Sequence, residues 1–98
     1  MPDHDHQPTR EHLICAVAET STLWDRYVLA VTPHDGGQWV IEHRSCGLFW
    51  DRHHTWTPGI ANAARLPEDK ARRLADRLAV DLITDGIAAT ETLRGLQH

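Results

Sequence analysis

Residues 50–56, with the sequence WDRHHTW, hold the densest group of side chains that could bind or react with another molecule. Tryptophan and arginine are common anchors of protein interfaces, and imidazoles transfer protons near neutral pH. The segment could therefore be a binding surface, a catalytic pair of imidazoles or only the tip of a hairpin. We predict a hairpin tip that contacts a partner through Trp50, Arg52, His53, His54 and Trp56.

The length of the loop in this hairpin decides how its two tryptophans lie. An odd number of loop residues would place Trp50 opposite Trp56 on one face, and an even number would place them on opposite faces. A three-residue loop prefers a glycine in the left-handed conformation, and this segment contains no glycine. We therefore predict a four-residue loop, 52–55, with Asp51 opposite Trp56. One tryptophan would then be buried and the other presented to a partner.

His43 is a second candidate for chemistry. If strand pairing sets it beside Leu29, it lies on the buried face of a sheet. We predict a core histidine with one ring nitrogen bound to backbone or carboxylate. The alternative is an acid or base that works with Cys46 or a carboxylate in a closed pocket. Motifs such as GxSxG, GxGxxG and the phosphate-binding P-loop do not occur, so the sequence does not favour an enzyme and assigns no catalytic residue.

The eight histidines raise the question of metal binding. The tract DHDH (residues 3–6) resembles a metal-binding run, and loss of Met1 would leave a terminal amine that could chelate Cu(II) or Ni(II) together with His4. We interpret residues 1–8 as a disordered, solvated tail ahead of one domain, residues 9–98. Since the sequence contains no HExxH, CxxC or HxxxH pattern, we predict no metal and no cofactor.

The composition fits one ordinary globular domain of 98 residues, with 41% apolar and 24% charged residues. The net charge of −4 disfavours general affinity for nucleic acid or anionic membranes. No apolar run is long enough to span a bilayer, and the polar start differs from a secretory signal. Cys15 and Cys46 are too few for a disulfide framework. We therefore expect a cytoplasmic protein with reduced thiols and no membrane association.

Residues 26–44 carry the clearest structural pattern, since two β-branched and aromatic runs flank the sequence HDGG. A three-residue loop, 35–37, built as a type I turn followed by a left-handed glycine, would pair Leu29 with His43 and Val31 with Ile41. This register gathers one apolar face. The face would consist of Tyr27, Leu29, Val31, Trp39, Ile41 and His43.

The other elements complete an α+β domain. We expect an N-terminal helix over about residues 10–20, although LICAV would also suit a strand. A third strand at about 47–51 and a short fourth at about 55–57 should follow the hairpin. A long amphipathic helix is expected over about 67–85. The order predicts a three- to four-stranded antiparallel sheet with helices on one face.

The long helix has the most regular pattern. Its apolar stripe consists of Ala71, Leu74, Ala75, Leu78 and Leu82. Pro67 suits its first position, and Gly86 is typical of a helix end. After Gly86 we expect one further short helix or a loose packing arm.

The last helix also suggests nucleic-acid binding. Its sequence DKARRLADRLAV (residues 69–80) resembles the final helix of double-stranded RNA-binding domains, as does the order helix, three strands, helix. The resemblance implies duplex binding through Lys70, Arg72, Arg73, Arg77 and Arg44. The chain departs from that family because it has one lysine where the family has a pair, and neighbouring acidic residues dilute the charge.

A second resemblance covers residues 47–78, about a third of the chain. The sequence GLFWDRHHTWTPGIANAARLPEDKARRLADRL is similar to a pattern in small uncharacterised proteins of high-GC actinobacteria and their phages. In that pattern a tryptophan hairpin precedes an amphipathic helix. The resemblance implies no activity, and it suggests an accessory or mobile-element role.

Taken together, these features predict a small cytoplasmic protein-interaction module, a regulator or inhibitor that binds a macromolecular partner. A protein partner is favoured over nucleic acid, because the charge balance is acidic and tryptophan is abundant. A duplex nucleic-acid-binding module is the first alternative, and a small enzyme or ligand-binding domain using His43 is the second. The sequence leaves a homodimer open.

Overall fold

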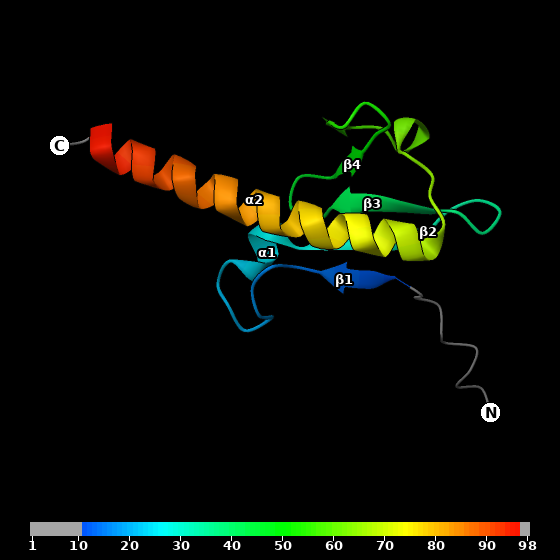
Figure 1. The fold of residues 1–98 in the computed structure, drawn as a ribbon, viewed down its shortest axis with the longest axis horizontal. Coiled ribbons are helices and arrows are strands. Elements are labelled where there is room, and N and C mark those ends of the chain that lie inside the picture. The colour runs from blue at the N-terminus through cyan, green and yellow to red at the C-terminus, as the bar shows by residue number, and fades with distance from the viewer. Residues whose placement is uncertain (1–10, 97–98) are drawn as a thin grey trace.

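The computed structural model describes the backbone of residues 11–96 and the side chains of residues 11–86. Five strands form one antiparallel sheet in the order β1-β2-β3-β4-β5, and a long helix, α2, packs against it (Figure 1). The α+β class is confirmed, but the predicted three- to four-stranded sheet is wrong, because the sheet has five strands. The elements are β1 (His12–Ile14), α1 (Trp24–Tyr27), β2 (Leu29–Pro33), β3 (Trp39–His43), β4 (Leu48–Trp50), β5 (Trp56–Thr57), η2 (Ile60–Asn62) and α2 (Glu68–Leu96).

The predicted N-terminal helix, 10–20, is wrong: this part of the chain contributes strand β1. Leu13 pairs with Ala30 and Ile14 pairs with Leu29 along the edge of β2. Side chains alternate as in a strand, since Ile14 packs on the core while Leu13 is 49% exposed on the other face. Pairing with the open edge of β2 satisfies backbone N–H and C=O groups of both segments, and this favours a strand over the helix that the local pattern indicated. The predicted tail, 1–8, lies outside the described residues.

The β2–β3 hairpin confirms the predicted register and loop length. Leu29 lies opposite His43 and Val31 lies opposite Ile41, and the His34 N–H donates to the Gln38 carbonyl at 2.8 Å across the three-residue loop. The turn type differs from the prediction. Both loop glycines have positive φ, 55° and 81°, whereas a type I turn would keep the first of them at negative φ.

Helix α2 begins close to the predicted start but does not end at Gly86. It continues to Leu96 and extends beyond the sheet (Figure 1). Gly86 does not end the helix. A glycine is required at this position because a Cβ built there would lie 2.1 Å from the Tyr27 hydroxyl oxygen. Tyr27 lies in α1 rather than on the sheet face. The absence of a side chain at Gly86 thus lets α1 pack directly against α2.

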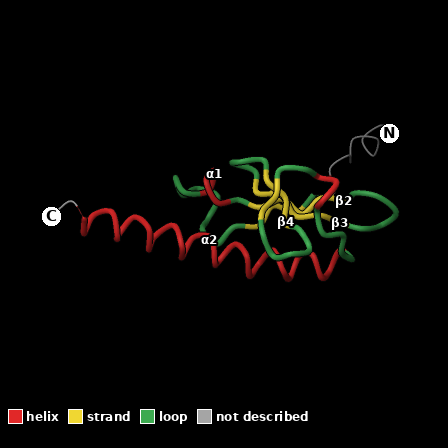
Figure 2. Tube along the Cα trace, turned by 90° about the horizontal axis from the view of Figure 1, so that it is seen from above, coloured by secondary structure: helices red, strands yellow, loops and turns green. Residues whose placement is uncertain are grey.

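The core lies between α2 and one face of the central hairpin, and Figure 2 shows the helix along one side of the strands. Ala71, Ala75 and Ala79 are buried on the helix face that meets the sheet. Their small side chains let the helix approach the strands closely. The strands contribute four apolar residues of the predicted face, namely Leu29, Val31, Trp39 and Ile41.

Burial of one aliphatic side chain of this kind contributes about 1.5–3 kcal/mol. The central hairpin and α2 are therefore the main source of stability. Within the described part of the chain, no helix is long and apolar enough to cross a membrane.

Candidate functional site

The β4–β5 hairpin has a three-residue loop, so the predicted four-residue loop, 52–55, is wrong. Trp50 lies directly opposite Trp56, and the Asp51 N–H donates to the Thr55 carbonyl at 3.0 Å. Residues 52–54 form the loop. His54 takes the left-handed conformation, with φ of 64°, in the place where a glycine was expected. Histidine adopts this conformation more readily than β-branched residues do, which is why the loop needs no glycine.

Asp51 holds the tip of this hairpin. Its carboxylate accepts hydrogen bonds from the backbone N–H groups of His53 and Thr55, at 2.8 and 3.0 Å, and from the Thr55 hydroxyl at 2.9 Å. The bond from the Thr55 N–H is the main reason that the pKa of Asp51 lies below its ordinary value. A charged aspartate that bonds backbone N–H groups fixes a tight turn locally. The tip is therefore an ordered loop.

The two tryptophans form one aromatic pair, so the prediction of one buried and one presented ring is also wrong. Their ring centres are 5.1 Å apart at an interplanar angle of 68°, an edge-to-face arrangement. Both residues are half-buried and pack against the core. The Trp56 ring lies 5.5 Å from the His43 ring, and the Trp50 ring lies 6.1 Å from the His54 ring. The hairpin thus carries an aromatic row beside the helix.

A groove of about 500 Å³ lies between this hairpin and α2. Its volume falls within the range of ligand-binding pockets. The apolar part of its lining consists of Trp50, Ala64, Leu66, Leu74 and Leu78. The polar part consists of Asp51, Arg52, His54, Arg77 and Asp81. Three of the five residues predicted at the hairpin, Trp50, Arg52 and His54, line this groove, and His53 and Trp56 do not.

The segment of residues 63–66, which the sequence left as an irregular link, forms part of the groove wall. Leu66 exchanges two backbone hydrogen bonds with Trp39, at 2.7 and 3.0 Å, and the Ala64 N–H donates to the Trp50 carbonyl at 2.8 Å. Asp51 and Ala63 form a further bridge. These bonds place Ala64 and Leu66 in the lining. Only the apolar character of the two residues could have indicated them from sequence.

Two guanidinium groups at the groove have no partner among the described residues. Arg52 and Arg77 are both exposed, and neither makes an ion pair or a hydrogen bond with any described residue. Arg77 and Asp81 are one helical turn apart, yet they do not form an ion pair. Both oxygens of Asp51 bond within the hairpin. Within the described part of the chain, the groove therefore offers two guanidinium groups and the Asp81 carboxylate without a hydrogen-bond partner.

The residues predicted for nucleic acid are only partly brought together. Lys70, Arg72, Arg73 and Arg77 are all exposed on α2. Arg73 pairs with Asp69 at 3.7 Å. From Glu68 to Asp85 the helix carries five acidic and four basic residues, so it does not present a uniformly basic surface.

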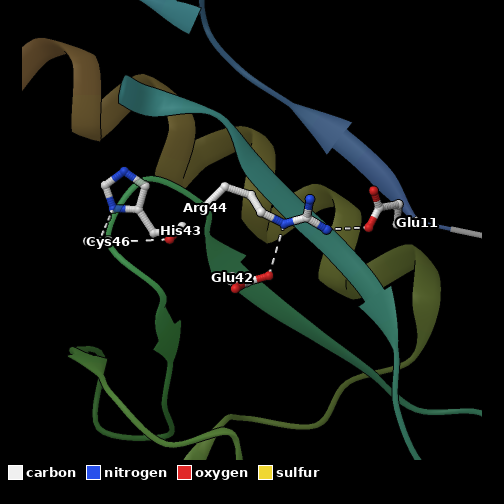
Figure 3. Close-up of polar contacts among 5 residues, drawn as sticks. All are labelled: Glu11, Glu42, His43, Arg44 and Cys46. Atoms are coloured by element: carbon white, nitrogen blue, oxygen red, sulfur yellow. Dashed lines mark hydrogen bonds and ion pairs between the residues drawn. The ribbon is translucent and has the colours of Figure 1, made fainter. Parts of the chain in front are cut away.

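Arg44 does not belong with the helix arginines. It lies on the sheet face opposite α2, where its guanidinium bonds Glu42 at 3.0 Å and also pairs with Glu11 (Figure 3). Partial burial acts in the other direction, but the hydrogen bonds to these two carboxylates raise the pKa of Arg44. Its charge is therefore already neutralised.

His43 is half-buried at the end of β3. Its Nε2 lies 2.9 Å from the Arg26 carbonyl oxygen, a backbone partner of the kind predicted for a core histidine. Its Nδ1 lies 3.1 Å from the Cys46 sulfur. Neither His43 nor Cys46 lines the groove or the two smaller hollows described among residues 11–86.

The described residues contain no group of three or more histidine, cysteine or acidic side chains placed to hold a metal. The DHDH tract lies outside them. The resemblances to double-stranded RNA-binding domains and to actinobacterial proteins stay predictions. No protein-family model, curated protein or solved structure is significantly similar to this chain.

Proposed function

We propose that this protein is a small protein-interaction module whose groove between the β4–β5 hairpin and α2 binds an acidic segment with an apolar anchor. The observation that carries the proposal is the position of Trp50 in an apolar lining, beside the guanidinium groups of Arg52 and Arg77, which pair with no described residue. A role as a cytoplasmic regulator or inhibitor, and an accessory or mobile-element origin, belong to the same proposal. These rest on composition and resemblance alone.

The apolar lining supports a side-chain anchor on the partner. Trp50 presents one half-buried indole, and Leu66, Leu74 and Leu78 extend the apolar surface along the groove. Interfaces obtain most of their binding energy from a few side chains, most often tryptophan, tyrosine and arginine, that fill such depressions. A tryptophan or leucine of the partner would fit this role.

The charges support an acidic partner. Arginine forms strong, often bidentate hydrogen bonds with carboxylates, and neither Arg52 nor Arg77 pairs with a described residue. The Asp51 carboxylate is occupied by the hairpin backbone, which leaves Asp81 as the one opposing carboxylate in the lining. The two arginines and two aspartates of the lining cancel in formal charge, so the partner's carboxylates would be recognised by direct hydrogen bonds to the two guanidinium groups and not by a net positive charge.

The test uses short fluorescent peptides with one tryptophan between glutamates, and peptides of the same length with lysine in place of glutamate. We expect the full chain to bind the acidic peptide, as measured by fluorescence anisotropy, and to bind the lysine peptide far more weakly. The double change Arg52→Glu with Arg77→Glu should weaken acidic-peptide binding by at least about tenfold, since one charged hydrogen bond is worth about 1.5–3 kcal/mol.

Arg72→Glu is the matched control, because Arg72 is exposed on the same helix but does not line the groove. It should leave acidic-peptide binding nearly unchanged. Equal binding of acidic and lysine peptides, or an equal loss of binding in Arg72→Glu and in the double variant of Arg52 and Arg77, would contradict the proposal. So would a failure of every acidic peptide to bind.

The nucleic-acid alternative predicts a different pattern. The exposed basic residues of α2 would give salt-sensitive binding to duplex RNA or DNA, and changing Arg72 and Arg73 to Glu would abolish it. Duplex binding of this kind, without acidic-peptide binding, would replace the proposed function with this alternative. No duplex binding at low salt would remove the alternative.

A further inference from the structure

We infer that Cys46 and His43 form a thiol–imidazole pair that makes Cys46 a site of thiol–disulfide exchange with small disulfides of the glutathione class. The Cys46 sulfur lies 3.1 Å from Nδ1 of His43 (Figure 3). This pair is separate from the groove, because neither residue lines it. The inference is therefore independent of the proposed function.

The hydrogen-bond partners of His43 determine which ring nitrogen can accept a proton. Nε2 lies 2.9 Å from the Arg26 carbonyl oxygen, and a carbonyl can only accept a hydrogen bond. Nε2 must therefore carry the hydrogen. In the neutral ring Nδ1 then has the free lone pair, and the Cys46 thiol donates to it.

Two further contacts support this orientation. The Ser45 hydroxyl donates to the same Arg26 carbonyl at 3.1 Å and lies 3.3 Å from Nε2. The Cys46 sulfur is 3.8 Å from the His43 carbonyl oxygen, so the shorter contact with Nδ1 is the stronger one. The imidazole is thus held by the backbone on one side and meets the thiol on the other. This is the arrangement of a nucleophile, its base and a group that orients the base.

Cys46 is also accessible. It is exposed in the turn between β3 and β4, next to Gly47, where an added Cβ would have no atom within 4 Å. Cys15 is half-buried, and no imidazole among the described residues bonds to it. The reactivity of a thiol depends on its accessibility and on a neighbouring base. The chain therefore contains one cysteine with both features, Cys46, and one that is less accessible and has no such base among the described residues, Cys15, and their reaction rates can be compared directly.

The exchange step transfers one proton, forms one S–S bond and breaks another. His43 Nδ1 takes the proton from the Cys46 thiol as the sulfur attacks one sulfur of the small disulfide. A new S–S bond forms between Cys46 and that half, and the original S–S bond breaks. The other half leaves as a thiolate and takes the proton from the imidazole. Cys46 is oxidised to a mixed disulfide, and the leaving half is reduced to a thiol.

The experiment compares single-thiol forms of the full chain. Cys15→Ser leaves Cys46, and Cys46→Ser leaves Cys15. Each is mixed with oxidised glutathione at neutral pH, and the mixed disulfide is followed by mass spectrometry. We expect Cys46 to react faster than Cys15, and His43→Gln in the Cys15→Ser background to slow Cys46 at least about tenfold through loss of the base.

Controls separate the pair from general changes in folding. Glutamine at position 43 can still donate to the Arg26 carbonyl. The matched control, His53→Gln in the same background, changes an exposed imidazole outside the pair, so it should not slow Cys46. The advantage of Cys46 over Cys15 should disappear in denaturant, a comparison that does not depend on whether the His43 variant folds. Equal rates for the two cysteines in the folded chain, or an unchanged rate in folded His43→Gln, would overturn the inference.

Discussion

The β2–β3 and β4–β5 hairpins share a three-residue loop, but different interactions hold them. The first pairs five residues on each strand and buries Leu29, Val31, Val40 and Ile41 almost completely. The second pairs two residues on each strand, and its tryptophans are only half-buried. The first hairpin, packed against α2, is therefore the main source of stability. The second is free to present side chains at the groove.

The two loops also obtain a left-handed residue in different ways. Gly37 adopts φ of 81° without any side chain to hinder it, whereas His54 adopts 64° within a tip that the Asp51 carboxylate bonds. Glycine makes the first loop favourable by itself. The second loop depends on a charged side chain, so its stability should depend on pH.

The largest effect is expected in the central hairpin. Ile41→Ala should lower the free energy of unfolding by about 2–5 kcal/mol, because it leaves a cavity under α2. Urea unfolding measures this loss. Ile41→Val is the matched control and should cost about 0.5–1.5 kcal/mol. A loss below about 1 kcal/mol for the alanine variant would show that the first hairpin is not the main source of stability.

A smaller loss is expected at the first loop. Gly37→Ala should lower the free energy of unfolding by about 1–2 kcal/mol, because the left-handed conformation is unfavourable for a residue with a Cβ. No atom lies within 4 Å of the added Cβ, so the whole loss would be conformational. Gly37→Asn should cost less, because asparagine adopts this conformation more readily. Equal losses for both variants in thermal unfolding would contradict this reading of the loop.

The second loop should weaken in acid. The pKa of Asp51 in the folded chain is lowered, chiefly by the hydrogen bond from the Thr55 N–H. The charged carboxylate therefore stabilises the fold fully at pH values above its unfolded pKa, about 4. That contribution is lost as the pH falls through the lowered folded value. The melting temperature of the parent chain should exceed that of Asp51→Asn at neutral pH, and the difference should shrink in acid. A difference that stays constant down to the acid limit would contradict the role of Asp51.

The smallest effect is expected at His54. His54→Gly removes the cost of the left-handed conformation but also the ring contact with Trp50. The free energy of unfolding should therefore change by less than about 1 kcal/mol. A loss above this value, measured by urea unfolding, would mean that the imidazole contributes to the aromatic row more than its geometry indicates.

The contrast between the hairpins also explains which predictions from sequence succeeded. The register of the first hairpin follows from local alternation and the glycine pair, and α2 follows from its 3.6-residue period. The loop length of the second hairpin was predicted wrongly because His54, and not a glycine, takes the left-handed conformation there. Asp51 holds this loop in place, but it does so through three hydrogen bonds that exist only in the folded tip. The sequence alone therefore does not indicate its role.

Other features depend on contacts between distant parts of the chain. Strand β1 forms because β2 has a free edge, and Gly86 lies in the middle of a helix because Tyr27 packs against it. The groove combines Trp50 with Arg77 and with Leu66, which Trp39 holds in place. The hairpin sequence indicates Trp50 and Arg52. Nothing local indicates that Arg77 turns toward them.

Trp50→Ala tests the central claim most directly, because it asks whether the second hairpin serves binding rather than folding. We expect the variant to unfold cooperatively in urea and to bind the acidic peptide at least about tenfold more weakly, as for a central interface anchor. Anisotropy titration measures the binding. An unchanged affinity for the peptide, or a chain that no longer folds, would contradict the division of roles between the two hairpins.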